Sequence, residues 1–399
     1  MKVLPLARRP IGYFVHHQGR GHAERAAAIL NALPPSRPAT VFCARPDIFP
    51  ALAPQVEVRT IPSLFEKDGD EGVGLDHVPT PDTLHCAPLG WGGPRRAVAE
   101  IARWFAEADP ALFVTDVSAE LAQLARIASV PHVTVLQNGE RTDPGHMAAY
   151  EGALGAIAPF DRSLAEPDWP DWLTAKTVFA GGLGARPIPD RATARRALGL
   201  PETPQIVLAI TGQGGGGISS APLGVGARAM PDTQWITIGQ VSTDWHATEP
   251  ANLRHIGWTD RAADWIGAAD LIVASTGNTA TQEILSAAKP WIAVPEWRYF
   301  DEQVRKAEAL QRAGLALHLP AMPASAAAWR RAVAAVRATH DPARQRAAVT
   351  ADPAGEVARW LERLASWHRP SDARPPTEEA QNGTIRLRPD HRPRPPLAS

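Results

Sequence analysis

The sequence predicts an α/β fold in which two domains each hold a parallel β-sheet. Short, fully apolar runs recur along the chain, and segments long enough for helices separate them. Such runs are typical of strands that are buried on both faces, as in parallel sheets. Two of them, at 11–15 and 206–210, are each followed by a glycine-rich turn and a helical segment. This repeat, in a chain of 399 residues, predicts two domains of one kind.

The first predicted domain, residues 1–170, begins with the strand at 11–15, the turn HHQGRGHAER and a helix from 26 to 33. Further strands are predicted at 39–43, 112–115 and 133–136. Strands that alternate with helices form βα units and hence a parallel sheet. Such sheets bind ligands outside the carboxyl ends of their strands, so we expect the glycine turn at a binding site.

The second predicted domain, residues 175–350, repeats this pattern with the strand at 206–210, the turn TGQGGGGISS and a helix of small residues. Further strands are predicted at 235–238, 271–274 and 291–294. The domains meet between 160 and 189, where PDWPDW and GGLGARPIP predict irregular structure. A last helix is predicted at 353–367. Residues 369–399 are rich in Pro and Arg without apolar periodicity, and we predict disorder there.

The composition limits the partners and the compartment. A formal net charge of −1 gives no overall attraction to nucleic acid. Cys43 and Cys86 are too few for a disulfide framework or a structural zinc site, and we expect free thiols. No segment resembles a signal peptide or approaches the roughly 20 apolar residues of a membrane span. We therefore expect a soluble cytoplasmic protein.

Residues 275–303, STGNTATQEILSAAKPWIAVPEWRYFDEQ, carry the most functional information. The predicted strand at 271–274 leads into a turn of small residues, and a helix with Glu283 follows. Unpaired N–H groups and the positive dipole make the N-terminus of such a helix an anion site. A carboxylate on this helix can also accept two hydrogen bonds from a diol such as a ribose. The segment therefore predicts a nucleotide at the edge of the sheet.

Four blocks of the chain resemble the GT-B glycosyltransferases, above all the MurG-like bacterial branch and the macrolide and plant secondary-metabolite transferases. The blocks are GRGHAER (19–25), LFVTDVSAELAQLARIASVPHVTV (112–135), TGQGGGG (211–217) and GWTD…ADLIVASTGNTATQEI…DEQ (257–303). Their order and spacing are specific for the fold, and the likeness extends to about Trp367. It implies two Rossmann-like domains facing a central cleft, with the last helix crossing back toward the first domain.

The resemblance implies a His–Asp pair for catalysis. His22 begins a predicted helix, whose positive end disfavours a charged imidazole and leaves it able to accept a proton. Glycosyl transfer to a hydroxyl needs such a base, worth roughly 10²–10⁴-fold. In plant members of the family an Asp matching Asp116 orients the base. The alternatives are a capping or phosphate-contacting role for His22 and an N-cap role for Asp116.

The resemblance also implies a donor site for a UDP- or dTDP-linked sugar. Glu283 would bind the ribose, and the helix start at 277–279 would take the diphosphate. Asp301 and Gln303 match a D-Q pair that reaches sugar hydroxyls, with Glu302 between them as an alternative. Ser275 replaces a histidine of the plant members, which is nearer the bacterial branch. The expected donor-site residues are Gly21, Gly212, Gly214, Ser219, Trp258, Thr259, Ser275, Gly277, Asn278, Thr279, Glu283, Asp301 and Gln303.

Other ligand motifs are incomplete, and three of the candidate features have plainer interpretations. Glu24 replaces the third glycine of a dinucleotide fingerprint, and no Gly-Lys-Ser/Thr completes a Walker loop. The D-x-D sequence at 68–70 resembles a metal motif of GT-A transferases, but we interpret it as a solvated loop and predict no metal and no cofactor. Glu283 has the alternative of an exposed helix carboxylate, and Trp258 that of a core residue. The basic segment at 95–105 is either a packed helix or a contact with an anionic membrane.

The predicted function is therefore transfer of a sugar from a nucleotide-diphosphate donor to a hydroxyl acceptor, without a metal and with inversion. The loops at 62–96 and 137–146 are expected to shape the acceptor site, and the acceptor is a small molecule or a lipid-linked one. Two alternatives remain: a nucleotide-sugar 2-epimerase or hydrolase of the same fold, and a module that binds a nucleotide sugar without catalysis.

Overall fold

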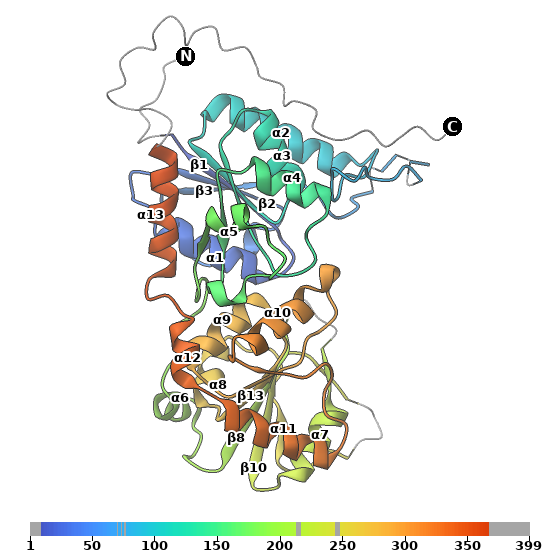
Figure 1. Cartoon of the computed structure of the whole chain (residues 1–399), viewed down its shortest axis with the longest axis vertical. Coiled ribbons are helices and arrows are strands. Elements are labelled where there is room, and N and C mark those ends of the chain that lie inside the picture. Colours follow the sequence, from blue (N-terminus) through green and yellow to red (C-terminus); the bar gives the residue numbers. More distant parts are fainter. Residues whose placement is uncertain are drawn as a thin grey trace, which may run out of the picture.

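The computed structural model describes residues 9–366, apart from residues 70, 73, 76, 213–216 and 244–247. Two lobes lie one above the other along the longest axis of the molecule, and each has a sheet between helices (Figure 1). The upper lobe holds the first half of the described chain and the lower lobe the second. The predicted tail at 369–399 and Trp367 lie outside the described residues.

The sheet of the first lobe has seven parallel strands in the order β3-β2-β1-β4-β5-β6-β7. The strands are β1 Ile11–Val15, β2 Ala39–Cys43, β3 Val56–Thr60, β4 Leu112–Asp116, β5 His132–Val135, β6 Gly155–Ala158 and β7 Thr177–Phe179. The helices are α1 Arg20–Asn31, α2 Gly92–Ala108, α3 Ala119–Ile127, α4 Pro144–Gly152 and α5 Asp171–Ala175. The predicted strands are confirmed. Because β7 belongs to this sheet, the lobe extends past the boundary predicted at residue 170.

The sheet of the second lobe has six parallel strands in the order β12-β10-β8-β13-β14-β15. The strands are β8 Gln205–Ile210, β10 Thr233–Ile238, β12 Leu253–His255, β13 Leu271–Ala274, β14 Trp291–Ala293 and β15 Leu317–His318, and a separate pair joins β9 Ile218–Ser219 to β11 Val241–Ser242. The helices are α6 Arg191–Leu198, α7 Ser220–Ala229, α8 Ala262–Ala268, α9 Asn278–Ala287, α10 Glu302–Arg312, α11 Ala326–Thr339 and α12 Pro342–Ala347.

Both sheets have the strand order of a Rossmann-like fold, which confirms the predicted fold class. In each lobe the chain starts in the middle of the sheet, builds outward on one side, and then crosses to the other side. The direction reverses between β1 and β4 and between β8 and β13, where the paired ends are Val15 with Asp116 and Ile210 with Ala274. Helices that leave such a point in opposite directions open a crevice at the carboxyl ends of the strands.

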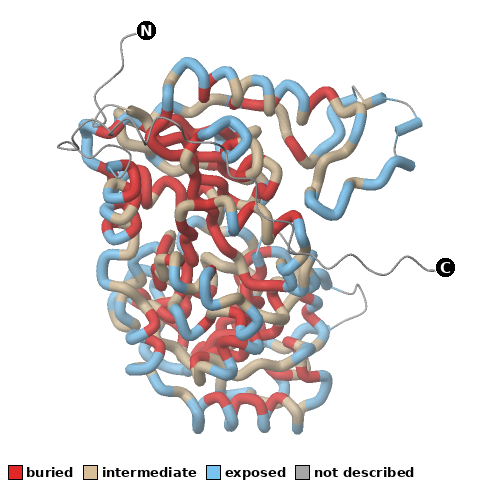
Figure 2. Tube along the Cα trace, turned by 45° about the horizontal axis from the view of Figure 1, so that its top comes forward, coloured by how far each residue is buried: buried red, intermediate tan, exposed pale blue. Residues whose placement is uncertain are grey.

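The central strands are buried on both faces, which explains their continuous apolar sequences. In β1, Tyr13 and Val15 pack toward α1 and α13, whereas Phe14 packs on the other face against Trp104 of α2. Figure 2 shows the buried segments running through the centre of each lobe and exposed segments around them. Burial of this kind stabilises by roughly 25 cal/mol per Å² of apolar surface.

The basic helix α2 is a packed helix. Its apolar residues Ile101, Trp104 and Phe105 are buried in the first lobe, so they are not presented to an outside surface. Among the described helices, none combines the length and the apolar content that a bilayer crossing requires.

The last described helix, α13 Pro353–Ser366, leaves the second lobe and returns to the first, where it lies beside α1 (Figure 1). Val357, Leu361 and Leu364 join the core between α1 and the first sheet. At the surface of this contact, Arg37 donates from Nε to Glu362 Oε1 over 2.7 Å. The chain therefore passes between the lobes twice.

Replacing Leu361 by Ala tests how far this helix supports the first lobe. Leu361 is fully buried, so we expect a loss of about 2–5 kcal/mol in the free energy of unfolding, measured in urea. Arg363→Ala, on the exposed face of the same helix, is the control and should change the value by less than about 0.5 kcal/mol. Equal effects of the two substitutions would contradict the docking of α13.

Candidate active site

A cavity of about 1620 Å³ lies between the lobes. It is lined by the residues that follow the central strands of both sheets, including His16 after β1, Val117 after β4, Thr211 after β8 and Ser275 after β13. Single-ligand pockets commonly measure about 300–1,000 Å³, so this volume is large enough for two substrates side by side. The cavity is thus at the position that the strand order of both lobes dictates.

Two helix N-termini face one another across this cavity. The N-cap residues are Gly19 for α1 and Gly277 for α9, and neither helix has a side-chain cap. A Cβ added to Gly21 would lie 2.7 Å from Thr279 Oγ1, so a side chain at residue 21 would require the Thr279 hydroxyl to shift. The first backbone N–H groups of both helices, with their positive dipole ends, are available to an anion in the cavity.

A buried carboxylate holds two side chains of α1 at the first of these helix ends. His22 Nδ1 lies 3.0 Å from Asp116 Oδ1, as the expected His–Asp pair requires. Arg25 Nε donates to Asp116 Oδ2 over 2.7 Å, and Arg25 Nη2 donates to Oδ1. The hydroxyl of Ser118 caps α3, so the N-cap alternative for Asp116 is wrong. Sequence reasoning missed Arg25; its i, i+3 spacing from His22 was the available signal.

Charge pairing controls the ionisation of this cluster. Burial alone would raise the pKa of Asp116, but the Arg25 guanidinium, followed by His22, holds it well below its usual range. Burial also disfavours the charged form of Arg25. The neighbouring Asp116 outweighs this effect and raises the pKa of Arg25. The next residue, Val117, has φ 61, a left-handed conformation that a β-branched residue adopts only under strain. Strain and buried charge thus meet at the end of β4.

A second histidine stays neutral beside this cluster. The ring of His16 stacks on Phe65 at 4.5 Å between centroids and lies 5.5 Å from the ring of His22. Burial, together with the neighbouring His22 and His17, lowers the pKa of His16 to about 3. His16 and Phe65 therefore give the first-lobe side of the cavity a neutral aromatic wall.

On the second-lobe side, Glu283 lies in the cavity wall on α9. It is buried with 3% exposed surface, so the alternative of an exposed helix carboxylate is wrong. Arg186, from the segment between the lobes, donates from Nε to Glu283 Oε1 over 2.6 Å and from Nη2 to Oε2 over 3.3 Å. Arg186 is the second site residue that the sequence did not reveal. Trp258 is 57% exposed and borders the cavity, which rules out the core interpretation.

The three polar residues 301–303, at the junction of the acidic loop and α10, are presented differently. Asp301 is exposed and does not border the cavity, whereas Glu302 and Gln303 do. Gln303 Oε1 accepts from the N–H of Glu296 over 2.8 Å, and its carbonyl accepts from Thr276 Oγ1 over 2.7 Å. Phe300 and Asp301 both have left-handed backbones, and this turns Asp301 away from the expected site.

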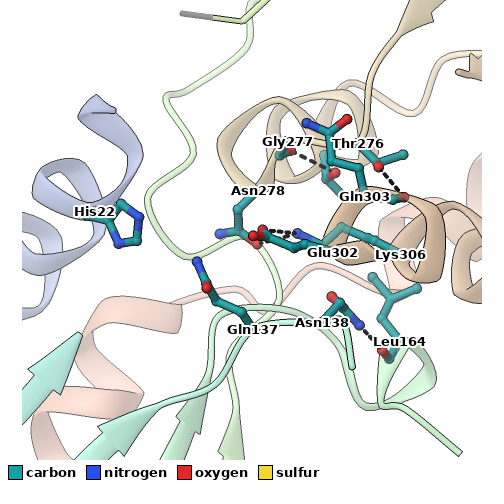
Figure 3. A network of polar contacts seen from close by, with 12 residues as sticks. His22, Gln137, Asn138, Leu164, Thr276, Gly277, Asn278, Glu302, Gln303 and Lys306 are labelled. Atoms are coloured by element: carbon teal, nitrogen blue, oxygen red, sulfur yellow. Dashed lines mark hydrogen bonds and ion pairs between the residues drawn. The ribbon is translucent and has the colours of Figure 1, made fainter. Parts of the chain in front are cut away.

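A polar network links these elements at the cavity (Figure 3). Lys306 is buried, donates to Asn278 Oδ1 over 3.4 Å and lies 3.9 Å from Glu302 Oε1. Arg141 of the first lobe approaches the same carboxylate, with 3.6 Å from Nη2 to Oε2. His22 faces Asn278 and Glu302 across the cavity in this view. Of Asp301 and its alternative Glu302, therefore, it is Glu302 that reaches the cavity.

The other expected site residues divide into two groups. Gly212, Thr259, Ser275, Gly277, Asn278 and Thr279 border the cavity with those already described. Ser219 caps α7 and does not border it, and Gly214 lies outside the described residues. Of the D-x-D sequence, Asp68 pairs with Arg96, and residue 70 is not described. Within the described parts of the chain, no three metal-binding side chains come together.

We compared the sequence and the structure with known proteins. Neither a family model nor a curated protein matches the sequence. Solved structures do match: MurG of Acinetobacter baumannii (TM-score 0.59, 14% identity) and the glycosyltransferase SnogD of Streptomyces nogalater (0.59, 16%) each cover 89% of this chain and 99% of their own. A UDP-glucosyltransferase of Polygonum tinctorium covers 91% of this chain and 99% of its own, with a TM-score of 0.59 and 14% identity.

The chain has the GT-B fold. Matches of this extent include both lobes and their relative order, so the predicted resemblance to GT-B glycosyltransferases is confirmed at the level of the fold. In GT-B terms, the first lobe is the N-terminal Rossmann-like domain, the second is the C-terminal one, and the cavity is the cleft between them.

The low pKa of His16 predicts a pH dependence of stability. An unfolded His titrates near pH 6.5, so below this value the unfolded chain binds a proton that the folded protein refuses until about pH 3. The free energy of unfolding should therefore fall as the pH drops through this window, by at most about 1.4 kcal/mol per pH unit. In His16→Asn, urea unfolding between about pH 7 and about pH 4 should show a weaker fall. His340→Asn, in the second lobe, is the control, and an unchanged slope in His16→Asn would contradict the prediction.

Proposed function

We propose that this protein is a glycosyltransferase that moves a sugar from a nucleotide-diphosphate donor, UDP- or dTDP-linked, to a hydroxyl acceptor. The observation that carries the proposal is the pair of helix N-termini without side-chain caps, with the half-buried His22 on the buried Asp116 at one end and the buried Glu283 at the other. The fold neighbours support it, because those compared above are named as MurG, a glycosyltransferase and a UDP-glucosyltransferase.

The donor would bind on the second lobe. The N–H groups at the start of α9 would receive the diphosphate, and Glu283 would accept hydrogen bonds from the ribose diol. Arg186 donates hydrogen bonds to the Glu283 carboxylate in the free protein. It would therefore share this carboxylate with the ribose and add a positive charge beside the phosphates. The exposed ring of Trp258 would stack on the base. Glu302 and Gln303 border the space left for the sugar.

The acceptor would bind on the first lobe, where His16 and Phe65 form the cavity wall beside His22. His22 Nε2 would take the proton of the acceptor hydroxyl while its oxygen attacks the anomeric carbon. The bond from that carbon to the diphosphate oxygen breaks in the same step, which inverts the anomeric centre. The departing negative charge is stabilised by the two helix N-termini, so the proposal needs no metal ion and no cofactor. The acceptor is a small molecule or a lipid-linked alcohol.

The donor site is tested by calorimetry with UDP, dTDP, GDP and ADP. We expect one of the first two to bind, and Glu283→Gln to weaken binding by about 10–100-fold because it loses charge-assisted hydrogen bonds to the ribose. Glu308→Gln, on the exposed side of α10, should bind as the unaltered protein does. Absence of binding by all four nucleotides would refute the proposed function.

The base is tested with His22→Ala. We expect turnover of a bound nucleotide sugar to fall by about 10²–10⁴-fold while nucleotide affinity stays unchanged, since His22 acts on the acceptor side. His340→Ala, distant from the cavity, is the matched control.

The same assay separates the alternative reactions. Sugar turnover without any added acceptor would instead indicate an epimerase or a hydrolase. Loss of turnover in a chelator, restored by Mg²⁺ or Mn²⁺, would overturn metal independence. If His22→Ala left turnover intact, His22 would not be the base.

A further inference from the structure

Arg25 is a buried, charged residue beside the proposed base to which the mechanism above gives no role. It is 2% exposed, and its guanidinium binds both oxygens of Asp116, which is itself fully buried. On the basis of the proposed function, we infer that Arg25 is a positioning residue: it neutralises Asp116, so that this carboxylate orients His22 without converting it to an imidazolium.

The first part of the inference concerns charge. A carboxylate next to a histidine favours the protonated ring, which is useless as a base. Here Asp116 Oδ2 accepts from Arg25 Nε, and Oδ1 faces both Arg25 Nη2 and His22 Nδ1. One buried negative charge thus meets one buried positive charge. The pair has no net charge, yet Oδ1 still accepts a hydrogen bond from the ring.

The second part concerns the hydrogen on the ring. Arg25 Nη2 lies 2.7 Å from His22 Nδ1, and Asp116 Oδ1 lies 3.0 Å from the same nitrogen. A guanidinium only donates and a carboxylate only accepts, so a single ring nitrogen serves one of them at a time. Because the proposed base needs an unprotonated Nε2, we assign the Nδ1 hydrogen to the bond with Asp116. Nε2 is then left unprotonated as the base, and a second proton on the ring would lie beside the guanidinium.

The position of Arg25 is restricted by the first lobe and by the chain segment between the lobes. It belongs to α1, three residues after His22, and the chain segment between the lobes passes directly over it. Gly184 of this segment has φ 78, and a Cβ there would lie 3.2 Å from the Arg25 Cα. The hydroxyl of Tyr13, buried on β1 below the cluster, has no hydrogen-bond partner. Little space remains for Arg25 to adopt another rotamer.

The other titratable groups near this cluster come from three elements. They are Tyr13 on β1, His16 and His17 after β1, and Glu302 and Lys306 on α10. All five stay in place in the variants below, so differences between variants report on the replaced residues, Arg25 and, in the double variant, Asp116.

The test is ¹⁵N NMR of His22 in the full chain, with the signal assigned by its loss in His22→Gln. In the unaltered protein we expect a neutral ring with its hydrogen on Nδ1. In Arg25→Met, the protonation midpoint of His22 should move to higher pH by about one unit or more, because Asp116 is left unneutralised. Arg25→Lys should shift it less. Arg37→Met is the matched control, since Arg37 is also a buried arginine paired with a carboxylate in the first lobe, and should leave His22 unchanged.

A second variant covers the case in which Arg25→Met does not fold. The double variant Arg25→Met, Asp116→Asn removes both buried charges, and its His22 midpoint should lie below that of Arg25→Lys. A hydrogen on Nε2 in the unaltered protein, or equal midpoints in the unaltered protein and the folded Arg25 variants, would overturn the inference. With an active enzyme, the acidic limb of the pH profile of kcat/KM in Arg25→Lys should shift in the same direction as the protonation midpoint of His22. NMR needs no substrate, so failure of the inference is distinct from failure of the proposed function, which nucleotide binding decides.

Discussion

The buried ion pair between Asp116 and Arg25 is the interaction on which the site depends. It lies where the strand order of the first sheet reverses, at the end of β4, and it ties α1 to the sheet. Two charges without water are tolerable only as a pair, since either alone would cost several kcal/mol. The pair therefore fixes the rotation of α1, and with it the direction of His22 and the end of the helix that points at the second lobe.

The two lobes use one scheme with different chemistry. Each places a helix end with glycine at its N-cap position, and so without a side-chain cap, at the reversal of its sheet. Each adds a buried carboxylate paired with an arginine: Asp116 with Arg25, and Glu283 with Arg186. In the first lobe the guanidinium is sealed in, while in the second it is 42% exposed and faces the cavity. A fully buried ion pair fixes the positions of its side chains, whereas an ion pair that is exposed to the cavity leaves its carboxylate within reach of a ligand.

The sequence allowed the fold and part of the site to be predicted, for identifiable reasons. Central strands such as β1 and β13 are buried on both faces, and this produces continuous apolar runs. Edge strands such as β3 are half-exposed and lack that signature. Arg25 and Arg186 were missed: their partners lie 91 and 97 residues away in the chain, and the family resemblance, which implied the pair of His22 with Asp116, implied no arginine beside either carboxylate. Asp301 was preferred over Glu302 because it matches the acidic residue of the family's D-Q pair, and no sequence rule reveals a left-handed backbone at residues that are not glycine.

The return of α13 to the first lobe has a consequence for how the protein is made. On the ribosome, the first lobe emerges long before the helix that completes its core, so its apolar groove beside α1 must wait for synthesis of the whole second lobe. Contacts between segments this far apart in sequence form slowly, and exposed apolar surface promotes aggregation in the interval. The first lobe thus completes its core only after α13 has been synthesised, whereas the residues that form the sheet of the second lobe are all synthesised before α13.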